Sequence, residues 1–193
     1  ANADFRDDIV FSGSLLDRLS DGYRKIRNTF RFCLGVLPDF DPADAVPHGK
    51  MLELDRWALA RFNRYVARTR ENYDAFQFHQ IVHQTLDLTA VDLSAFYLDI
   101  VKDRLYCDAP RELPRRSAQT AIHRIATDLA RLLAPIGSFT AEEVWQEPFA
   151  SSPAKLADES PSVLLADWPA LPAEWAAPEL AARYDLVLEA YPV

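Results

Sequence analysis

A long helical repeat of apolar residues over positions 12–37 is the feature that most constrains the fold of this chain. Ser12 or Ser14 is suited to cap the start of a helix, and Pro38 cannot continue it because proline lacks a backbone N–H. Between them, apolar or semi-apolar residues recur in steps of three and four, which places them on one helix face. They are Leu16, Leu19, Tyr23, Ile26, Phe30, Cys33 and Leu37.

Three later stretches repeat this pattern and predict helices over about 51–73, 76–108 and 115–134. In the second of these stretches we expect an interruption near Asp92, whose side chain offers a fresh N-cap. The helix over 51–73 has an apolar stripe and an opposite basic face, which carries Arg56, Arg61, Arg64, Arg68 and Arg70. Long amphipathic helices joined by short connections predict an all-α, antiparallel helix bundle.

The last third of the chain predicts a smaller and less regular part. Thr140 and Glu143 have the spacing of a capping box, in which each side chain satisfies a free backbone N–H of the other, and so predict a short helix. A loop, a short strand and a last helix at Pro178–Ala190 are expected after it. We therefore divide the chain into a helical bundle over residues 1–149 and a short irregular appendage over 150–193.

The charges are unevenly distributed along the chain, although the net charge is −8. Residues 1–135 contain 19 Lys/Arg and 19 Asp/Glu, whereas residues 136–193 contain 2 Lys/Arg and 10 Asp/Glu. Binding of a polyanion depends on local clusters of cations rather than on the total charge. Any surface that binds a polyanion is therefore expected within the first 135 residues.

Cysteine usage and hydropathy indicate a reducing, aqueous compartment. The two cysteines do not form a CxxC pair, so the sequence predicts neither a zinc knuckle nor a disulfide framework. No apolar stretch approaches the roughly 20 residues needed to span a bilayer, and no basic, apolar signal segment opens the chain. We expect a cytoplasmic protein without a membrane partner.

The first predicted helix carries a cluster of polar and basic residues beside its apolar stripe. The cluster consists of Arg24, Lys25, Arg27, Asn28 and Arg31. Arginine forks two N–H bonds onto a phosphate group and lysine acts as a point charge, so the cluster is a candidate phosphate-binding surface. The alternative is a solvated helix face on which Asp17 and Asp21 pair with Lys25.

Two shorter clusters are further candidates for phosphate contacts. Arg115, Arg116 and Gln119 open a predicted helix, whose free backbone N–H groups also attract phosphate. Lys102 and Arg104 alternate with tyrosines, and cations among aromatic rings hold phosphates and stack bases. Ion pairing with aspartates in the same helical turns is the alternative interpretation of this last cluster.

Other chemistry finds little support in the sequence. No phosphate-loop, nucleophile-elbow or dinucleotide fingerprint occurs. His79 and His83 have the i,i+4 spacing of zinc ligands, but no third ligand is evident. Two alternatives to RNA binding stay open at this point: a helical enzyme with a hidden site at these histidines, and a helical protein-interaction module whose basic faces are merely solvated.

Several short sequence words occur in the order typical of isoleucyl-tRNA synthetases, from about residue 4 to residue 169. The words are YRKIRNTFRF (23–32), DFDP (39–42), MLELDRWAL (51–59), DLSAFYLDIVKDRLY (92–106), RRSAQT (115–120), FTAEEVW (139–145) and WP (168–169). The run over 92–106 is the most specific of them, and valyl enzymes differ there. The chain therefore resembles the anticodon-binding part of this class I synthetase family.

The resemblance implies the family's helical fold and the task of docking the anticodon stem and loop of isoleucine tRNA. It also implies a parent enzyme that joins isoleucine to its tRNA with ATP and Mg²⁺, through an isoleucyl-adenylate. The HIGH and KMSKS signatures and the zinc-binding cysteines of many bacterial members are absent from this sequence. We expect a non-catalytic fragment without a cofactor of its own, whose first 12 or so residues form a junction to a missing catalytic domain.

Carried onto matching positions, the resemblance implies a set of tRNA-binding residues drawn from four of the words. They are Arg24, Lys25, Arg27, Asn28, Arg31, Arg56, Trp57, Lys102, Arg104, Arg115, Arg116 and Gln119.

Overall fold

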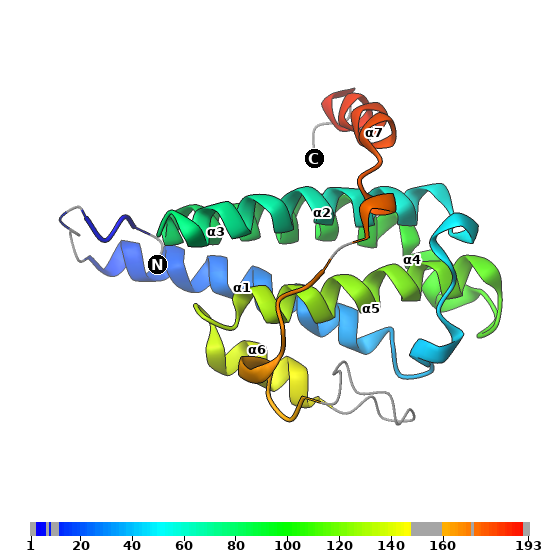
Figure 1. Cartoon of the computed structure of the whole chain (residues 1–193), viewed down its shortest axis with the longest axis horizontal. Helices are drawn as coiled ribbons and strands as arrows, with labels where there is room; N and C mark the ends of the chain where they lie inside the picture. Colours follow the sequence, from blue (N-terminus) through cyan, green and yellow to red (C-terminus); the bar gives the residue numbers. More distant parts are fainter. Residues whose placement is uncertain (1–2, 7, 9–11, 148–159, 171, 191–193) are drawn as a thin grey trace.

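The computed structural model describes residues 3–6, 8, 12–147, 160–170 and 172–190, and every regular element among them is helical (Figure 1). The prediction of an all-α fold is therefore confirmed. The long helices lie side by side along the long axis of the molecule and alternate in direction. They are α1 (Gly13–Gly35), α2 (Glu53–Asp74), a continuous helix made of α3 (Phe78–Asp87), η3 (Leu88–Tyr97) and α4 (Leu98–Cys107), and α5 (Leu113–Leu133).

Helix α1 begins where the sequence predicts and ends at Gly35, two residues before the predicted end at Leu37. The Ser12 side chain accepts a hydrogen bond from the backbone N–H of Leu15 at 3.2 Å, which satisfies one of the free donors of the first turn. The predicted apolar stripe is buried only in its second half. Leu16 and Tyr23 are 48% and 51% exposed, whereas Phe30 lies in the core, because the packing of the neighbouring helices covers the second half of α1.

Helices α2 and α5 pack against each other at the centre of the molecule. They supply many of the largest fully buried side chains, among them Trp57, Phe62, Ile122 and Leu129. Burial of one such side chain stabilises the fold by about 1.5–3 kcal/mol. The central pair therefore provides a rigid base on which the outer helices present their polar residues.

The predicted N-cap at Asp92 is wrong. The chain stays helical through this region and widens to π-helical winding over η3. The Asp92 side chain caps no helix but accepts a hydrogen bond from Nε of Arg61 at 2.7 Å. Burial raises the pKa of Asp92 despite the pairing with Arg61. The long-range ion pair, rather than local capping, thus fixes this side chain.

The predicted capping box is also wrong. Helix α6 (Ser138–Gln146) has its N-cap position at Gly137, three residues before Thr140, and no side-chain cap. The Thr140 hydroxyl instead shares a 2.8 Å hydrogen bond with the Tyr23 hydroxyl of α1. Trp145 lies buried within α6.

The C-terminal part is irregular until its last helix, α7 (Pro178–Ala190), whose bounds match the prediction. The expected strand is wrong, because among the described residues this region contains only the short 3-10 turns η4 (Val163–Leu165) and η5 (Ala173–Trp175) before α7. The segment crosses the bundle and contributes Val163 and Trp175 to the common core (Figure 1). The predicted boundary at residues 149/150 lies outside the described residues, and the division stays a prediction.

None of the described helices combines the length and the apolar character that crossing a membrane requires.

Candidate nucleic-acid interface

The basic cluster predicted on the first helix lies on the outward side of α1, and we call this surface the α1 face. Its five members are all exposed; they are Arg24, Lys25, Arg27, Asn28 and Arg31. Arg24 pairs with Asp21 at 3.2 Å, and the pairs of Lys25 with Asp17 or Asp21 that the alternative interpretation required do not form. The side chains of Lys25, Arg27 and Arg31 make no hydrogen bond or ion pair with any residue that the structure describes. The α1 face therefore holds three cations whose donors are available to a ligand.

Contacts with η3 and α4 fix the position of the helix that carries the α1 face. The Thr29 hydroxyl contacts the Ser94 hydroxyl at 3.0 Å and donates to the Thr89 carbonyl at 3.3 Å, which joins α1 to η3. Phe32 packs edge-on against Tyr106 of α4, with ring centroids 6.5 Å apart. A charged surface on a helix fixed in this way keeps its geometry when a ligand arrives, which lowers the cost of ordering on binding.

A groove of about 440 Å³ runs between α1 and α6, beside two of the free cations. Arg27 and Arg31 form one wall, the apolar side chains of Phe30 and Val144 are among its lining, and Glu143 and Glu147 line the side toward α6. Such a combination of guanidinium planes, apolar surface and carboxylate acceptors suits a base that has left its stack.

The cluster predicted on α4 separates into two different environments. Lys102 is exposed and donates to Asp99 at 2.7 Å, which is the intrahelical pairing of the alternative interpretation. Arg104 instead reaches inward and forks onto Asp55, with nitrogen–oxygen distances of 3.1 and 3.3 Å. The predicted pair of phosphate ligands therefore does not share a surface.

Asp55 is fully buried and is the centre of a polar network inside the bundle. Besides Arg104, it accepts hydrogen bonds from the Tyr97 hydroxyl at 2.9 Å and the Ser117 hydroxyl at 2.5 Å. Burial, together with the neighbouring Asp55 charge, raises the pKa of Tyr97 well above its ordinary value, which keeps this hydroxyl a donor. The network joins α2, η3, α4 and α5 through one carboxylate.

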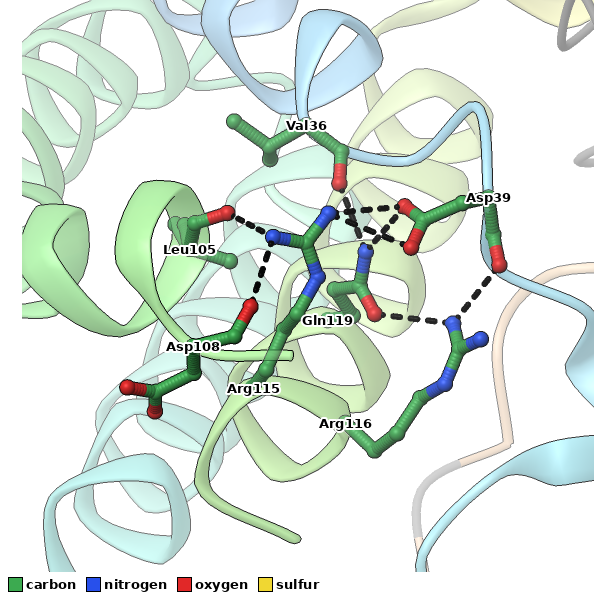
Figure 2. A network of polar contacts seen from close by, with 7 residues as sticks. All are labelled: Val36, Asp39, Leu105, Asp108, Arg115, Arg116 and Gln119. Atoms are coloured by element: carbon green, nitrogen blue, oxygen red, sulfur yellow. Dashed lines mark hydrogen bonds and ion pairs between the residues drawn. The ribbon is translucent and has the colours of Figure 1, made fainter. Parts of the chain in front are cut away.

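The cluster predicted at the start of α5 forms a second internal network (Figure 2). Arg115 donates to both carboxylate oxygens of Asp39 at 3.1 Å, and Arg116 donates to the Asp39 carbonyl at 2.7 Å. Gln119 is fully buried, accepts from Arg116 and donates to Asp39 and to the Val36 carbonyl. These side chains tie the α1–α2 connection to α5.

The electrostatics of this network agree with its geometry. Partial burial opposes ionisation of Asp39, but hydrogen bonds from Arg115 and Gln119 and the charge of Arg116 outweigh that effect and lower its pKa. The side chains of Arg115, Arg116 and Gln119, which were predicted to bind phosphate, thus form hydrogen bonds within the protein. We do not carry these three residues, or Arg104, into the interface proposed below.

The remaining two predicted residues lie on α2, near α7. Trp57 is fully buried and stacks on Tyr184 with ring centroids 5.2 Å apart, so it is a core residue. Arg56 is half-buried and lines a surface pocket together with His48 and Arg183. Neither residue lies on the α1 face.

The two histidines of the enzyme alternative lie on α3 with their ring centroids 6.3 Å apart. Within the described ranges, no group of three or more His, Cys, Asp or Glu side chains is placed to hold a metal ion.

One basic group was visible in the sequence but was not predicted to be a site. Arg61, Arg64 and Arg68 of α2 share one small pocket with Asp87 and Asp92. Their spacing of three and four residues is the only sequence signal that could have grouped them.

Comparison with known proteins shows which family the sequence of this chain matches. A family model described as the anticodon-binding domain of tRNA ligase matches residues 55–191. The chain is 45% identical over 190 residues to an isoleucine–tRNA ligase of Syntrophotalea carbinolica, an alignment that covers 98% of this chain and 20% of the relative. A similar match, 45% over 191 residues, covers 98% of this chain and 20% of the isoleucine–tRNA ligase of Moorella thermoacetica. The Thermotoga maritima isoleucine–tRNA ligase is 47% identical over 146 residues, which are 75% of this chain and 16% of the relative.

The chain therefore belongs to the family of anticodon-binding domains of tRNA ligases. The relatives named above are isoleucine–tRNA ligases, as the sequence words indicated, and the chain spans about a fifth of their length.

Proposed function

We propose that this chain is the tRNA-binding helical part of an isoleucine–tRNA ligase, and that the α1 face contacts the backbone of the anticodon stem and loop of isoleucine tRNA. The three available cations Lys25, Arg27 and Arg31, held on a braced helix within the region aligned to isoleucine–tRNA ligases, are the observation that carries this proposal. Phosphate contacts of this kind fix register and orientation, while unstacked bases are read separately. The groove beside Arg27 and Arg31 is suited to such a base.

The parent enzyme proposed here attaches isoleucine to its tRNA in the cytoplasm, with ATP and Mg²⁺ bound elsewhere in its polypeptide. The partners of this chain are then isoleucine tRNA and the remainder of the ligase. The chain itself contributes positioning rather than chemistry, since its available groups are cations suited to holding phosphate.

A fluorescence titration of labelled isoleucine tRNA tests the α1 face. Arg27→Ala and Arg31→Ala should each lower the affinity roughly tenfold, the loss expected for one charge-assisted hydrogen bond. Arg111→Ala removes the same charge from an exposed position in the α4–α5 connection and should leave the affinity unchanged. Absence of tRNA binding by the unchanged chain, or equal affinities for all these variants, would contradict the proposal.

A further inference from the structure

A ridge of three arginines on α2, formed by Arg61, Arg64 and Arg68, lies outside the α1 face. These side chains line a pocket of about 100 Å³ between α2 and the α3–η3 helix. Arg68 is exposed and has no ion pair or hydrogen bond with a described residue. Arg61 is oriented by Asp92, which accepts from its Nε at 2.7 Å and leaves its terminal nitrogens directed elsewhere.

The carboxylate of Asp185, supplied by α7, pairs with two of these three arginines. Arg64 forks onto it with both terminal nitrogens at 3.1 Å, and Arg61 contacts it at 3.4 Å. A planar anion held by a guanidinium fork is the arrangement by which arginine also binds the oxygens of a phosphate group. Asp185 therefore lies where a phosphate would bind.

The local charge balance also favours an anion at this position. Without α7, the three arginines of the ridge face two carboxylates, Asp87 and Asp92, which leaves a local charge of +1. The charge of Asp185 brings that balance to zero. The ridge is thus complementary to one negative group, and α7 supplies it.

Helix α7 packs against the core through the partly buried Leu180, Tyr184 and Leu188, and Ala181 is its one buried residue. Tyr184 stacks on Trp57, and Arg183 pairs with Glu53 at 2.7 Å, but both partners of this ion pair are about half exposed or more. Exposed ion pairs contribute little to stability and weaken in salt. The ion pairs of Asp185 with Arg61 and Arg64 are also partly exposed, so a polyanion could compete for these arginines while the apolar contacts of α7 persist.

We propose that Arg61, Arg64 and Arg68 form a second RNA phosphate site, which Asp185 occupies in the absence of RNA and vacates when the RNA backbone binds. The proposal rests on the function proposed above for the identity of the polyanion. It gives α7 the role of an acidic cover, so that the α2 ridge is open only to a ligand with enough negative charge to compete with Asp185.

The matched pair of variants Asp185→Asn and Glu189→Gln tests this role in a tRNA titration. Each removes one negative charge from α7, but the Glu189 side chain is exposed and does not contact the ridge. Asp185→Asn should raise the affinity about two- to fivefold, the gain that corresponds to loss of one exposed competing ion pair, whereas Glu189→Gln should leave it near the unchanged value. Arg64→Gln should lower the affinity and remove the gain from Asp185→Asn in the double variant.

Hydrogen exchange over residues 178–190 provides an independent measurement. The backbone amides of α7 should exchange faster when tRNA is added. Slower exchange with tRNA, or identical affinities of Asp185→Asn and Glu189→Gln, would overturn the proposed cover. If the α1 variants lose affinity while the α2 ridge variants do not, only this inference fails; if the reverse holds, the α1 face fails instead.

Discussion

The arginines of α1 and those of α4 and α5 all lie in sequence words of the same family, but they occupy opposite environments. Arg27 and Arg31 extend from α1 with no partner among the described residues, whereas Arg104 and Arg116 reach inward to Asp55 and to the Asp39 carbonyl. The difference lies in what faces each residue in space. An arginine side chain supports the fold where a carboxylate or carbonyl acceptor lies within its reach.

This difference has an energetic basis. Removing a guanidinium group from water is costly unless an anion and hydrogen-bond acceptors replace the water. The inward arginines meet this requirement with Asp55 or Asp39, and the protein thereby gains fixed contacts between helices. The exposed arginines stay hydrated and retain their capacity to bind an external anion. One class should therefore affect folding and the other RNA binding.

The largest expected effect tests the interior network. Asp55→Ala leaves the Arg104 guanidinium without its counter-charge and should destabilise the protein by about 3–5 kcal/mol, measured by urea unfolding. Asp99→Asn, which breaks the exposed pair with Lys102, should leave the unfolding midpoint close to that of the unchanged protein. Similar midpoints for the two variants would contradict the distinction between the two classes of ion pair.

Arg116→Ala sharpens the comparison, because its position was predicted to bind tRNA. Loss of its hydrogen bonds to the Asp39 carbonyl and Gln119 should cost about 2 kcal/mol of stability. The salt dependence of tRNA binding, measured below the unfolding temperature, should not change. If the Arg116→Ala variant showed normal stability and a flatter salt dependence of tRNA binding, Arg116 would be assigned to the tRNA interface after all.

The pH dependence of stability tests the interior at a third position. Burial, together with the charges of Arg124 and Arg131, lowers the pKa of His123 to about 4. Because protonation then favours the unfolded chain, the contribution of His123 is fully present above its unfolded pKa of roughly 6.5 and is lost as the pH falls toward 4. Between pH 7 and 5 the loss should be about 1–2 kcal/mol.

Urea unfolding at the two pH values measures this loss, and His123→Asn serves as the control without a titrating ring. The variant should show a smaller decrease in the free energy of unfolding between pH 7 and 5. An equal decrease in both proteins would assign the pH dependence to other groups.

The smallest expected effect on stability lies on the α1 face. Arg31→Ala removes an exposed side chain without an internal partner, so its free energy of unfolding should stay within about 0.5 kcal/mol of the unchanged value. Thermal unfolding followed by circular dichroism measures this. A loss as large as that of Arg116→Ala would show that Arg31 supports the fold.

Local chemistry was readable from the sequence, and long-range pairing was not. The cap at Ser12, the stop before Pro38 and the bounds of α7 follow from nearby residues. The pairing of Arg104 with Asp55 joins residues 49 positions apart, and that of Arg115 with Asp39 spans 76 positions. Asp92 and Thr140 were predicted as caps for the same reason, since their real partners Arg61 and Tyr23 lie on other helices.

The candidate site was therefore predicted in part. The sequence identified the α1 cluster as a candidate, and three of its four cationic side chains have no partner among the described residues. The sequence alone could not separate this cluster from the inward arginines. A resemblance between sequence words does not tell which side-chain donors form hydrogen bonds inside the protein. The α2 ridge was visible only as a spacing, and its cover by Asp185 depends on contacts across more than 120 residues.

The salt dependence of tRNA binding tests the central claim most directly. For the triple variant Lys25→Ala/Arg27→Ala/Arg31→Ala, the slope of log Kobs against log salt concentration should be less steep than that of the unchanged protein by about 2–3, since each phosphate contact contributes roughly 0.7–0.9. An unchanged slope in a folded triple variant would contradict the account, because the outward cations of α1 would then release no counterions from the RNA.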